Sequence, residues 1–266
     1  MTTGKSAKIR GTREWAVAAI DCCTGCSHGC RYCYARYDAV VRHKTLSAAG
    51  WGVPKIDLKA LTREYPLYPG QVMFPASHDI QPEIVDDCIL LLEKLLEAGN
   101  TVLVVSKPHL RSIEKICDTF KEKKQALLFR FSITAQDGEI LRFWEPAAPL
   151  YAERLTALRY AHEHGFQTSV SVEPMLASGN IEELVAEVAP FVTHSIWIGK
   201  MNRIGERVEI DSAETAKEVQ RIEAGQSDEK IRALYQRLQH HELVRWKESI
   251  KEVVGLKLPD RAGLDL

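Results

Sequence analysis

The chain has 266 residues, 45% of them hydrophobic, and its 35 Lys and Arg balance 36 Asp and Glu. This length supports one large domain or two small ones, and the near-zero net charge gives no electrostatic reason to expect nucleic acid or a membrane surface as a partner. No apolar run approaches the roughly eighteen residues of a membrane span, and the polar, basic start lacks the apolar core of a secretory signal. We therefore expect a cytoplasmic protein.

The first elements of the chain surround a cysteine-rich loop. Residues 1–14 are basic and have little to bury, which predicts a flexible arm. Residues 15–20 form a short apolar run that predicts a first strand, and residues 35–44 show a weak helical period. Residues 50–69 contain glycines and prolines without a sustained period, so we expect an irregular connection there.

Strand and helix patterns alternate from residue 71 onward. Residues 83–98 repeat apolar side chains at helical spacing, with Pro82 at the start and Gly99 just past the end. Residues 101–106 are rich in β-branched side chains, as in a strand buried on both faces. The same reasoning predicts strands at 71–77, 127–134, 166–172 and 194–198, and helices at 113–120, 151–164 and 181–188. Further helices are predicted at 213–224, 228–240 and 244–254.

This alternation of about six strand–helix units favours parallel strands joined by right-handed crossovers. Six units fall short of the eight that close a standard barrel. We therefore predict an α/β fold with a partial (β/α)6 barrel over residues 15–205. A helical extension, residues 206–266, is expected to pack on that barrel. A doubly wound sheet is the alternative architecture.

The cysteine loop predicts a metal site. Seven cysteines, an odd number, do not suggest a disulfide framework. Cys26, Cys30 and Cys33 can hold three irons of a cubane cluster and leave the fourth iron open, whereas a ferredoxin supplies four cysteines. A structural zinc site also needs four ligands, and Cys23 would complete two C-x-x-C pairs, although only three residues separate them. The cluster is preferred, and a zinc-binding structural or interaction module is the alternative.

Residues 24–36, with an aromatic residue before the last cysteine, resemble the signature of the radical S-adenosylmethionine (SAM) superfamily, and in particular its spore photoproduct lyase-like branch. The resemblance implies a partial barrel, a 4Fe–4S cluster on Cys26, Cys30 and Cys33, and SAM bound to the open iron. An electron from the cluster would cleave SAM and give a 5′-deoxyadenosyl radical that abstracts hydrogen. The resemblance also implies an electron donor such as flavodoxin or ferredoxin.

The same resemblance implies residues that contact SAM. The segment that contains Ser77 lies where the family places polar groups near the SAM amino group. Lys107 resembles a strand-end lysine that meets the SAM carboxylate, and Ser132 on the next strand is aimed at SAM. Tyr32 and Tyr34 flank the last cysteine and would shield the cluster and SAM. A further family string is matched by residues 145–149 and Arg154.

Strand ends support this location independently. Polar residues follow or end five predicted strands: Ser77, Lys107, Thr134, Glu173 and Lys200. That rim is where parallel barrels place their sites. Arg130 and Ser132 share one face of their strand, and a polar face inside a barrel needs partners that a charged ligand would supply.

The candidate catalytic residues are His78, Asp79 and Glu173, each near a strand end. Spore photoproduct lyase has a cysteine hydrogen donor shortly before an Asp-Ile pair, and matching that pair to residues 79–80 puts Ala76 in the donor's place. Repair of a DNA photoproduct is therefore a weaker alternative, and the absence of a basic excess agrees with this. The substrate is not identified.

The remaining cysteines have simpler interpretations. Cys88 and Cys117 fall on the apolar faces of their helices and are expected in the core. Cys22 and Cys23 are expected to pack at a strand end, and a role as auxiliary ligands is the alternative. His28 is expected near the site because it lies inside the cysteine loop.

Overall fold

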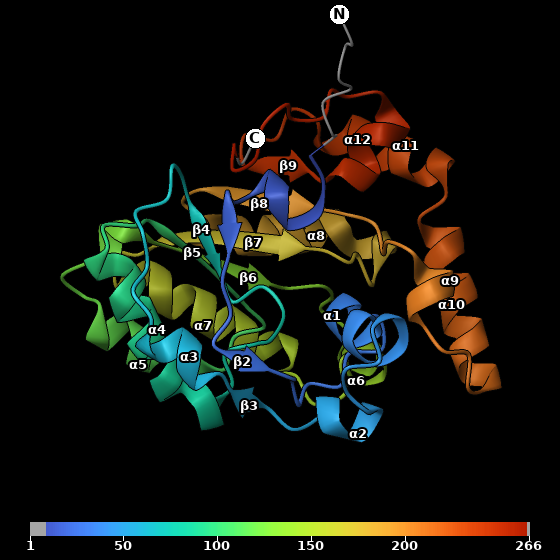
Figure 1. Cartoon of the computed structure of the whole chain (residues 1–266). Coiled ribbons are helices and arrows are strands. Elements are labelled where there is room, and N and C mark those ends of the chain that lie inside the picture. The colour runs from blue at the N-terminus through green and yellow to red at the C-terminus, as the bar shows by residue number, and fades with distance from the viewer. Residues whose placement is uncertain (1–8, 265–266) are drawn as a thin grey trace, which may run out of the picture.

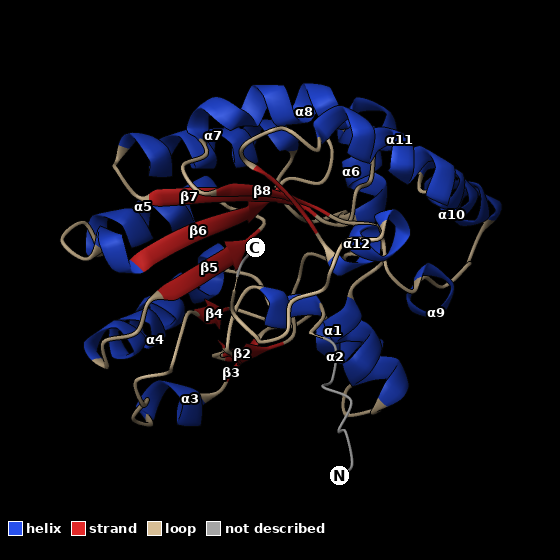
Figure 2. Cartoon of the chain, turned by 90° about the horizontal axis from the view of Figure 1, so that it is seen from above, coloured by secondary structure: helices blue, strands red, loops and turns tan. Residues whose placement is uncertain are grey.

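The computed structural model describes residues 9–264 and has one parallel sheet at its centre. The strand order is β1-β4-β5-β6-β7-β8-β9, and every neighbouring pair is parallel. Helices form an arc over the outer face of the sheet and leave its inner side open, so the barrel is incomplete (Figures 1 and 2). The predicted α/β partial barrel is confirmed.

The strands are short and almost entirely buried. Five of them lie within or close to the predicted runs: β4 (Val72–Phe74), β5 (Val102–Ser106), β6 (Leu127–Ser132), β7 (Gln167–Val172) and β8 (Ser195–Ile198). The first strand, β1, is reduced to Ala18–Ala19. On β6, Phe129 and Phe131 face the core beneath the helices, whereas Arg130 lies over Trp15 inside the barrel. The predicted division of this strand into two faces is confirmed.

The outer helices also follow the prediction. Their bounds are α4 (Val85–Glu97), α5 (Leu110–Thr119), α7 (Tyr151–Glu163), α8 (Ile181–Val188), α10 (Ala213–Gly225) and α11 (Asp228–Leu238). Gly99 ends the α4 region in the left-handed conformation, with φ of 82°, which glycine adopts at low cost. Cys88 and Cys117 lie in the main core, as predicted. Two further helices, α6 (Gly138–Trp144) and α9 (Ile204–Arg207), were not predicted.

The segment after the cysteine loop is more ordered than predicted. It contains α1 (Tyr34–Arg36), a π-helix (Tyr37–Arg42), α2 (Ala48–Trp51), β3 (Lys55–Ile56) and α3 (Leu58–Thr62). β3 pairs antiparallel with β2 (Cys23–Thr24). The expectation of an irregular connection over residues 50–69 is wrong for its first half, because elements of two to five residues are too short to show a period.

The predicted helix over residues 244–254 is wrong at its start. Val244–Trp246 form β9, which pairs with β8 as the seventh strand, and only Glu248–Val254 form a helix, α12. Over three residues a period of 2 cannot be told from a period of 3.6, and edge pairing with β8 decides the conformation. The predicted helical extension therefore contributes a strand to the sheet.

The predicted looseness of the N-terminal arm is wrong for residues 9–14, while residues 1–8 lie outside the described part. Gly11–Glu14 form a 3-10 helix, and Ile9 and Glu14 are buried. Glu14 forms ion pairs with Lys247 at 2.8 Å and Lys251 at 3.0 Å. Because the segment is otherwise basic, its composition did not indicate that Glu14, its one acidic residue, would form ion pairs at the start of α12. Across residues 9–264, no helix combines the length and apolarity needed to cross a membrane.

Candidate functional site

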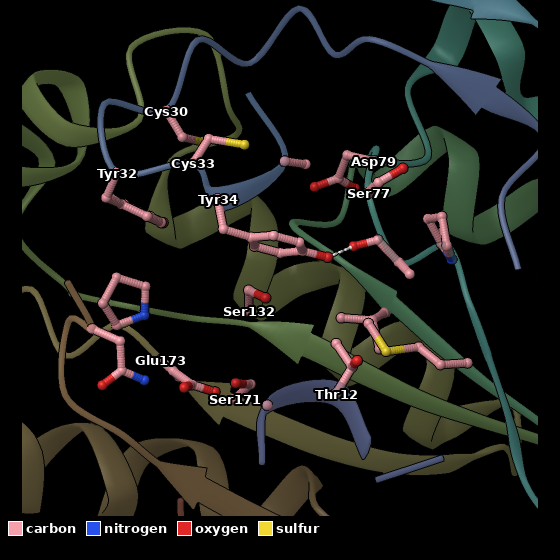
Figure 3. A pocket seen from close by; sticks show the side chains of 18 of the residues that line it. Thr12, Cys30, Tyr32, Cys33, Tyr34, Ser77, Asp79, Ser132, Ser171 and Glu173 are labelled. Carbon is pink, nitrogen blue, oxygen red and sulfur yellow. Dashed lines mark hydrogen bonds between the residues drawn. The ribbon is translucent and has the colours of Figure 1, made fainter. Parts of the chain in front are cut away.

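A pocket of about 870 Å³ lies at the C-terminal ends of the strands, near the upper end of the roughly 300–1,000 Å³ found for small-molecule sites. We call its two walls the cysteine side and the distal side (Figure 3). The cysteine side comprises Cys26, Cys30, Tyr32, Cys33, Tyr34, Ser77, Asp79, Lys107 and Ser132. The distal side comprises Thr12, Ser171, Glu173, Lys200 and Arg207. The fold thus gathers nearly all the predicted site residues around one space.

One edge of the cysteine loop is held by the segment after α2. The amide of Cys26 donates to the carbonyl of Trp51 at 2.9 Å. Gly25 has φ of 98°, and a Cβ there would lie 2.7 Å from the same carbonyl oxygen. Only glycine permits this approach. The short elements within residues 50–69, which the sequence did not predict, therefore help to hold Cys26, the first predicted cluster ligand, in place.

The other edge of the loop is held by the residues that follow α6. The amide of Arg31 donates to the carbonyl of Trp144 at 2.9 Å, and the amide of Ala147 donates to the carbonyl of His28 at 3.1 Å. These two backbone hydrogen bonds, which run in opposite directions, join the loop to residues 144–147. The family string at 145–149 thus corresponds to a backbone clamp on the cysteine loop.

The three loop thiols have environments that suit iron. Burial raises the pKa of the Cys26 thiol to about 12 and holds the pKa of Cys30 well above its ordinary value. Such thiols ionise only when a positive charge is supplied, as bound iron supplies it. Cys33 caps α1, and its sulfur accepts the amide of Arg36 at 3.4 Å, a contact of the kind that stabilises cluster sulfurs.

A four-cysteine zinc site is not formed. Cys23 is buried in the main core, and its sulfur donates to the carbonyls of Thr24 at 3.6 Å and Gly25 at 3.8 Å. Cys22 also lies in this core, so both cysteines pack as predicted. Within residues 9–264, no three Cys, His, Asp or Glu side chains are grouped as a single metal ion requires. A cluster differs, because each of its cysteines binds a separate iron.

A buried ion pair that sequence reasoning did not predict underlies the cysteine side. Glu145 and Arg154 pair with each other, and both are about fully buried. Tyr32 donates its hydroxyl to Glu145, and Thr134 does so at 3.0 Å. Burial alone would raise the pKa of Glu145, but Arg154 and Lys107 hold it below its usual value. Thr134, predicted at the rim, therefore supports this pair. The resemblance of residues 145–149 and Arg154 to a family string was the sequence signal that could have indicated this ion pair.

Asp79 organises the cysteine side through hydrogen bonds. Its carboxylate accepts the hydroxyl of Ser106 and the amide of Lys107 at 3.0 Å, and it lies 3.3 Å from Nδ1 of His28. Burial would raise the pKa of Asp79, but the charges of His28 and Lys107 and the bonds it accepts hold that pKa far below its usual value. Both oxygens are occupied by the chain's own donors, so Asp79 acts here as a support.

His78 is occupied in the same way. Its Nε2 accepts the amide of Cys22 at 3.3 Å, and its Nδ1 donates to the carbonyl of Asp79 at 3.0 Å. The side chain is fully buried. With both ring nitrogens engaged, this predicted catalytic candidate has no free donor or acceptor for a substrate.

The predicted SAM contacts surround the middle of the pocket. Lys107 Nζ lies 5.7 Å from the ring centroid of Tyr32. Burial would lower the pKa of Lys107, but the nearby Cys30, Glu145 and Asp79 raise it, which keeps the ammonium charged. Figure 3 shows the ring of Tyr34 between Ser77 and Ser132, with its hydroxyl donating to the carbonyl of Ala76.

Glu173 stands on the distal side with few partners. Its nearest cation is Lys247, 3.8 Å away, and burial raises the pKa of its carboxyl group. Figure 3 shows Glu173 beside Ser171 and across the space from the cysteines, with Thr12 nearby. Lys200 lines the same wall and lies 3.6 Å from Asp228. Sequence reasoning had no signal for Thr12 or Arg207, because neither belongs to a predicted strand end.

The sequence profile of the Radical SAM superfamily matches residues 20–191. The chain belongs to this superfamily. Members of this superfamily are enzymes that use a 4Fe–4S cluster and SAM, and they need a substrate and an electron donor. When bound, a reduced cluster would supply the electron that cleaves SAM to methionine and a 5′-deoxyadenosyl radical, the species that abstracts hydrogen. The buried thiols and the charged lysine of the cysteine side fit this cofactor pair.

Two curated relatives of this radical SAM protein carry names that state no function. The chain is 29% identical over 182 residues to protein ORF301 of Acidianus two-tailed virus, which covers 64% of the chain and 59% of that relative. It is 24% identical over 173 residues to protein MJ0683 of Methanocaldococcus jannaschii, which covers 63% and 64%. The chain thus spans less than two thirds of the length of these relatives.

Solved radical SAM structures share the fold. A spore photoproduct lyase mutant with bound AdoMet and dinucleoside spore photoproduct superposes with a TM-score of 0.53 at 16% identity, covering 86% of this chain and 75% of the lyase. Streptococcus suis SuiB bound to its precursor peptide SuiA gives a TM-score of 0.55 at 10% identity, covering 93% and 54%. At these identities the likeness extends to the fold alone.

Proposed function

We propose that this chain is a radical SAM enzyme that abstracts hydrogen from a substrate held in the strand-end pocket. In this proposal Cys26, Cys30 and Cys33 bind the 4Fe–4S cluster. The observation that carries it is that these three sulfurs line the same pocket as the polar strand ends. The loop that bears them is fixed on both edges by backbone hydrogen bonds, which favours ligands held in place before the cluster binds.

The residues of the cysteine side would orient SAM. Lys107 stays charged and is positioned by Asp79, which suits it to pair with the SAM carboxylate. Ser77 and Ser132 would offer hydroxyl groups to SAM. Tyr32 is locked to Glu145, and the ring of Tyr34 would cover the cofactor and exclude water. Asp79 and His78 would act as supports because their own hydrogen-bonding groups are occupied.

Repair of a DNA photoproduct stays the weaker alternative, because it would need a hydrogen donor other than a described cysteine of this pocket. Among the described residues that line the pocket, the cysteines are only the three proposed ligands. The hydroxyl of Tyr34 donates to the carbonyl of Ala76, the residue in the donor's place. Any hydrogen returned to a substrate radical would therefore need a source other than a pocket thiol.

The proposed electron donor is an acidic flavodoxin or ferredoxin in the cytoplasm, where thiols stay reduced. Residues 31–64 wrap the cysteine loop and contain seven Lys and Arg against three Asp and Glu, although the whole chain is nearly neutral. Val53 and Leu58 in this segment are more than half exposed. A basic surface with apolar residues, close behind Cys26, suits a transient complex with an acidic carrier.

Anaerobic reconstitution with iron and sulfide tests the proposed function. The wild type should take up about four irons and four sulfides per chain, and reductant with SAM should then release 5′-deoxyadenosine. Cys30→Ala should lose most of the iron and all detectable cleavage. Cys23→Ala is the matched control, since this sulfur packs in the core and its hydrogen bonds go to backbone carbonyls, and the variant should keep both. Full cluster loading and cleavage in Cys30→Ala would overturn the proposal, whereas one zinc lost from Cys23→Ala would favour the zinc module.

A further inference from the structure

The distal side contains a carboxylate, that of Glu173, which accepts no hydrogen bond from any residue that the structure describes. Lys247 is the nearest cation to Glu173, at 3.8 Å. The ammonium of Lys247 is already committed at shorter range to Glu14 at 2.8 Å, the carbonyl of Gly11 at 2.8 Å and Glu248 at 3.4 Å. Two of its donors are taken at 2.8 Å by Glu14 and the carbonyl of Gly11, and Glu173 at 3.8 Å lies beyond hydrogen-bond distance of it. The carboxylate of Glu173 therefore keeps free acceptor positions that face the pocket.

Packing fixes this carboxylate in place. A Cβ on Gly199 would lie 2.9 Å from Cγ of Glu173 and 2.9 Å from Cγ of Lys247. Both side chains thus rest directly on the backbone at the end of β8, in space that only a glycine leaves open. A carboxyl group held this firmly has the properties of a built binding group.

Arg207 is the complementary group on the same wall. Within residues 9–264 its Nε is buried without a hydrogen-bond partner, and its guanidinium carbon lies 5.9 Å from the ring centroid of Tyr34. Arg203, one turn earlier, pairs with Glu206, whereas no ion pair joins Arg207 to a described residue. The charge of Arg207 acts on the pKa of Glu173, so the two groups share one electrostatic environment.

We propose that Glu173 and Arg207 bind a substrate that carries an ammonium group and a carboxylate, as an amino acid does. The ammonium would meet Glu173, because a buried carboxylate is best compensated by a full positive charge. The carboxylate would meet Arg207, whose planar donors match it in a bidentate manner. A purely anionic substrate would face Glu173, and a purely cationic one would face Arg207. This inference rests on the proposed function, since it names the substrate class of that site.

The test uses the reconstituted enzyme saturated with SAM under anaerobic conditions. Each of the twenty proteinogenic L-amino acids is titrated by calorimetry, and those that bind are repeated as their Nα-acetyl and carboxamide forms. We expect at least one amino acid to bind, and its affinity to fall at least tenfold when either charge is blocked. The result that overturns the inference is that no amino acid binds, that the blocked forms bind equally well, or that nucleoside 5′-monophosphates bind instead.

Variants test the same contacts from the protein side. Glu173→Gln and Arg207→Met should each weaken binding at least tenfold, and Gly199→Ala should weaken it by displacing Glu173. Arg203→Met is the matched control, because this arginine is exposed and paired with Glu206. Unchanged affinity in both Glu173→Gln and Arg207→Met overturns the inference. Comparison of the blocked ligands needs no variant, so it decides the matter even if a variant fails to fold.

Failure of this inference can be separated from failure of the proposed function. Release of 5′-deoxyadenosine by the wild type is measured in the same preparation. If the wild type cleaves SAM but binds no amino acid, only the substrate class is wrong. If no 5′-deoxyadenosine forms with a full cluster and reductant, the proposed function itself is wrong.

Discussion

The two sides of the pocket differ in how their polar groups are satisfied. On the cysteine side, Asp79, His78 and Glu145 have their hydrogen-bonding groups occupied by the chain itself. On the distal side, within residues 9–264, the carboxylate of Glu173 accepts no hydrogen bond and Nε of Arg207 has no hydrogen-bond partner. A wall that is satisfied internally is rigid before any ligand arrives, whereas open polar groups are satisfied only by a ligand. The difference suggests that the cysteine side serves a constant cofactor and the distal side a specific substrate.

Removing Arg154 should cause the largest loss of stability among the changes proposed for the two sides, because it breaks the buried network that supports the cysteine side. Arg154→Met leaves Glu145 as a buried, unpaired charge, which costs about 3–5 kcal/mol. Chemical denaturation should show that loss, together with a lower iron content after reconstitution, since Glu145, which holds the hydroxyl of Tyr32, loses its counter-charge. Arg159→Met on the same helix is the control: its side chain is exposed and lies over Phe191, so it should change stability by less than about 1 kcal/mol. Equal losses in the two variants would show that Glu145 and Arg154 are not a special support.

A second prediction concerns Glu248, which lines the pocket and lies 3.4 Å from the ammonium of Lys247. Burial, together with a hydrogen bond to Glu14, raises the pKa of Glu248 to about 7. A carboxyl group whose folded pKa is raised favours its protonated form, so its stabilising effect is complete below about pH 4.5 and is lost as the pH rises through 7. Glu248→Gln imitates the protonated form. It should therefore be more stable than the wild type at pH 8 by about 1–3 kcal/mol and nearly equal to it at pH 4.5.

Thermal unfolding of the two proteins across this pH range gives the measurement. Glu252→Gln supplies the control, because this residue is exposed on the same helix and pairs with Arg10. It should show no such rise in relative stability between pH 4.5 and 8. A constant difference between Glu248→Gln and the wild type at every pH would mean that Glu248 does not titrate in this range.

The contrast between the two sides also explains what could be predicted from sequence. The partial barrel followed from long, regular patterns, and the cysteine side followed from C-x3-C-x2-C spacing and strand-end residues such as Lys107. The support of that side was indicated only by the family string at residues 145–149 and Arg154, and nothing in the local pattern predicts that Glu145 and Arg154 pair after folding. The distal side was indicated only by the strand-end residues Glu173 and Lys200. Arg207 lies on a four-residue helix, and Thr12 lies in a segment whose basic composition suggested an arm.

The smallest expected effect concerns the outer surface behind the cysteine side, where the proposed electron donor docks. Lys55 and Lys59 are exposed in the basic segment that covers Cys26. Changing both to Glu should slow reduction of the cluster by an acidic flavodoxin about tenfold at low ionic strength, because favourable steering becomes repulsion. The difference should shrink as salt rises, since exposed charges are screened within about 10 Å at 0.1 M.

The control makes the same charge change at the exposed Lys121 and Lys123, which precede β6 and so lie at the opposite end of the strands. Stopped-flow reduction by flavodoxin measures both double variants, and a small reductant such as dithionite should reduce all of them alike. If the Lys121 and Lys123 variant slows equally, the effect reflects net charge, and residues 31–64 are not the docking surface.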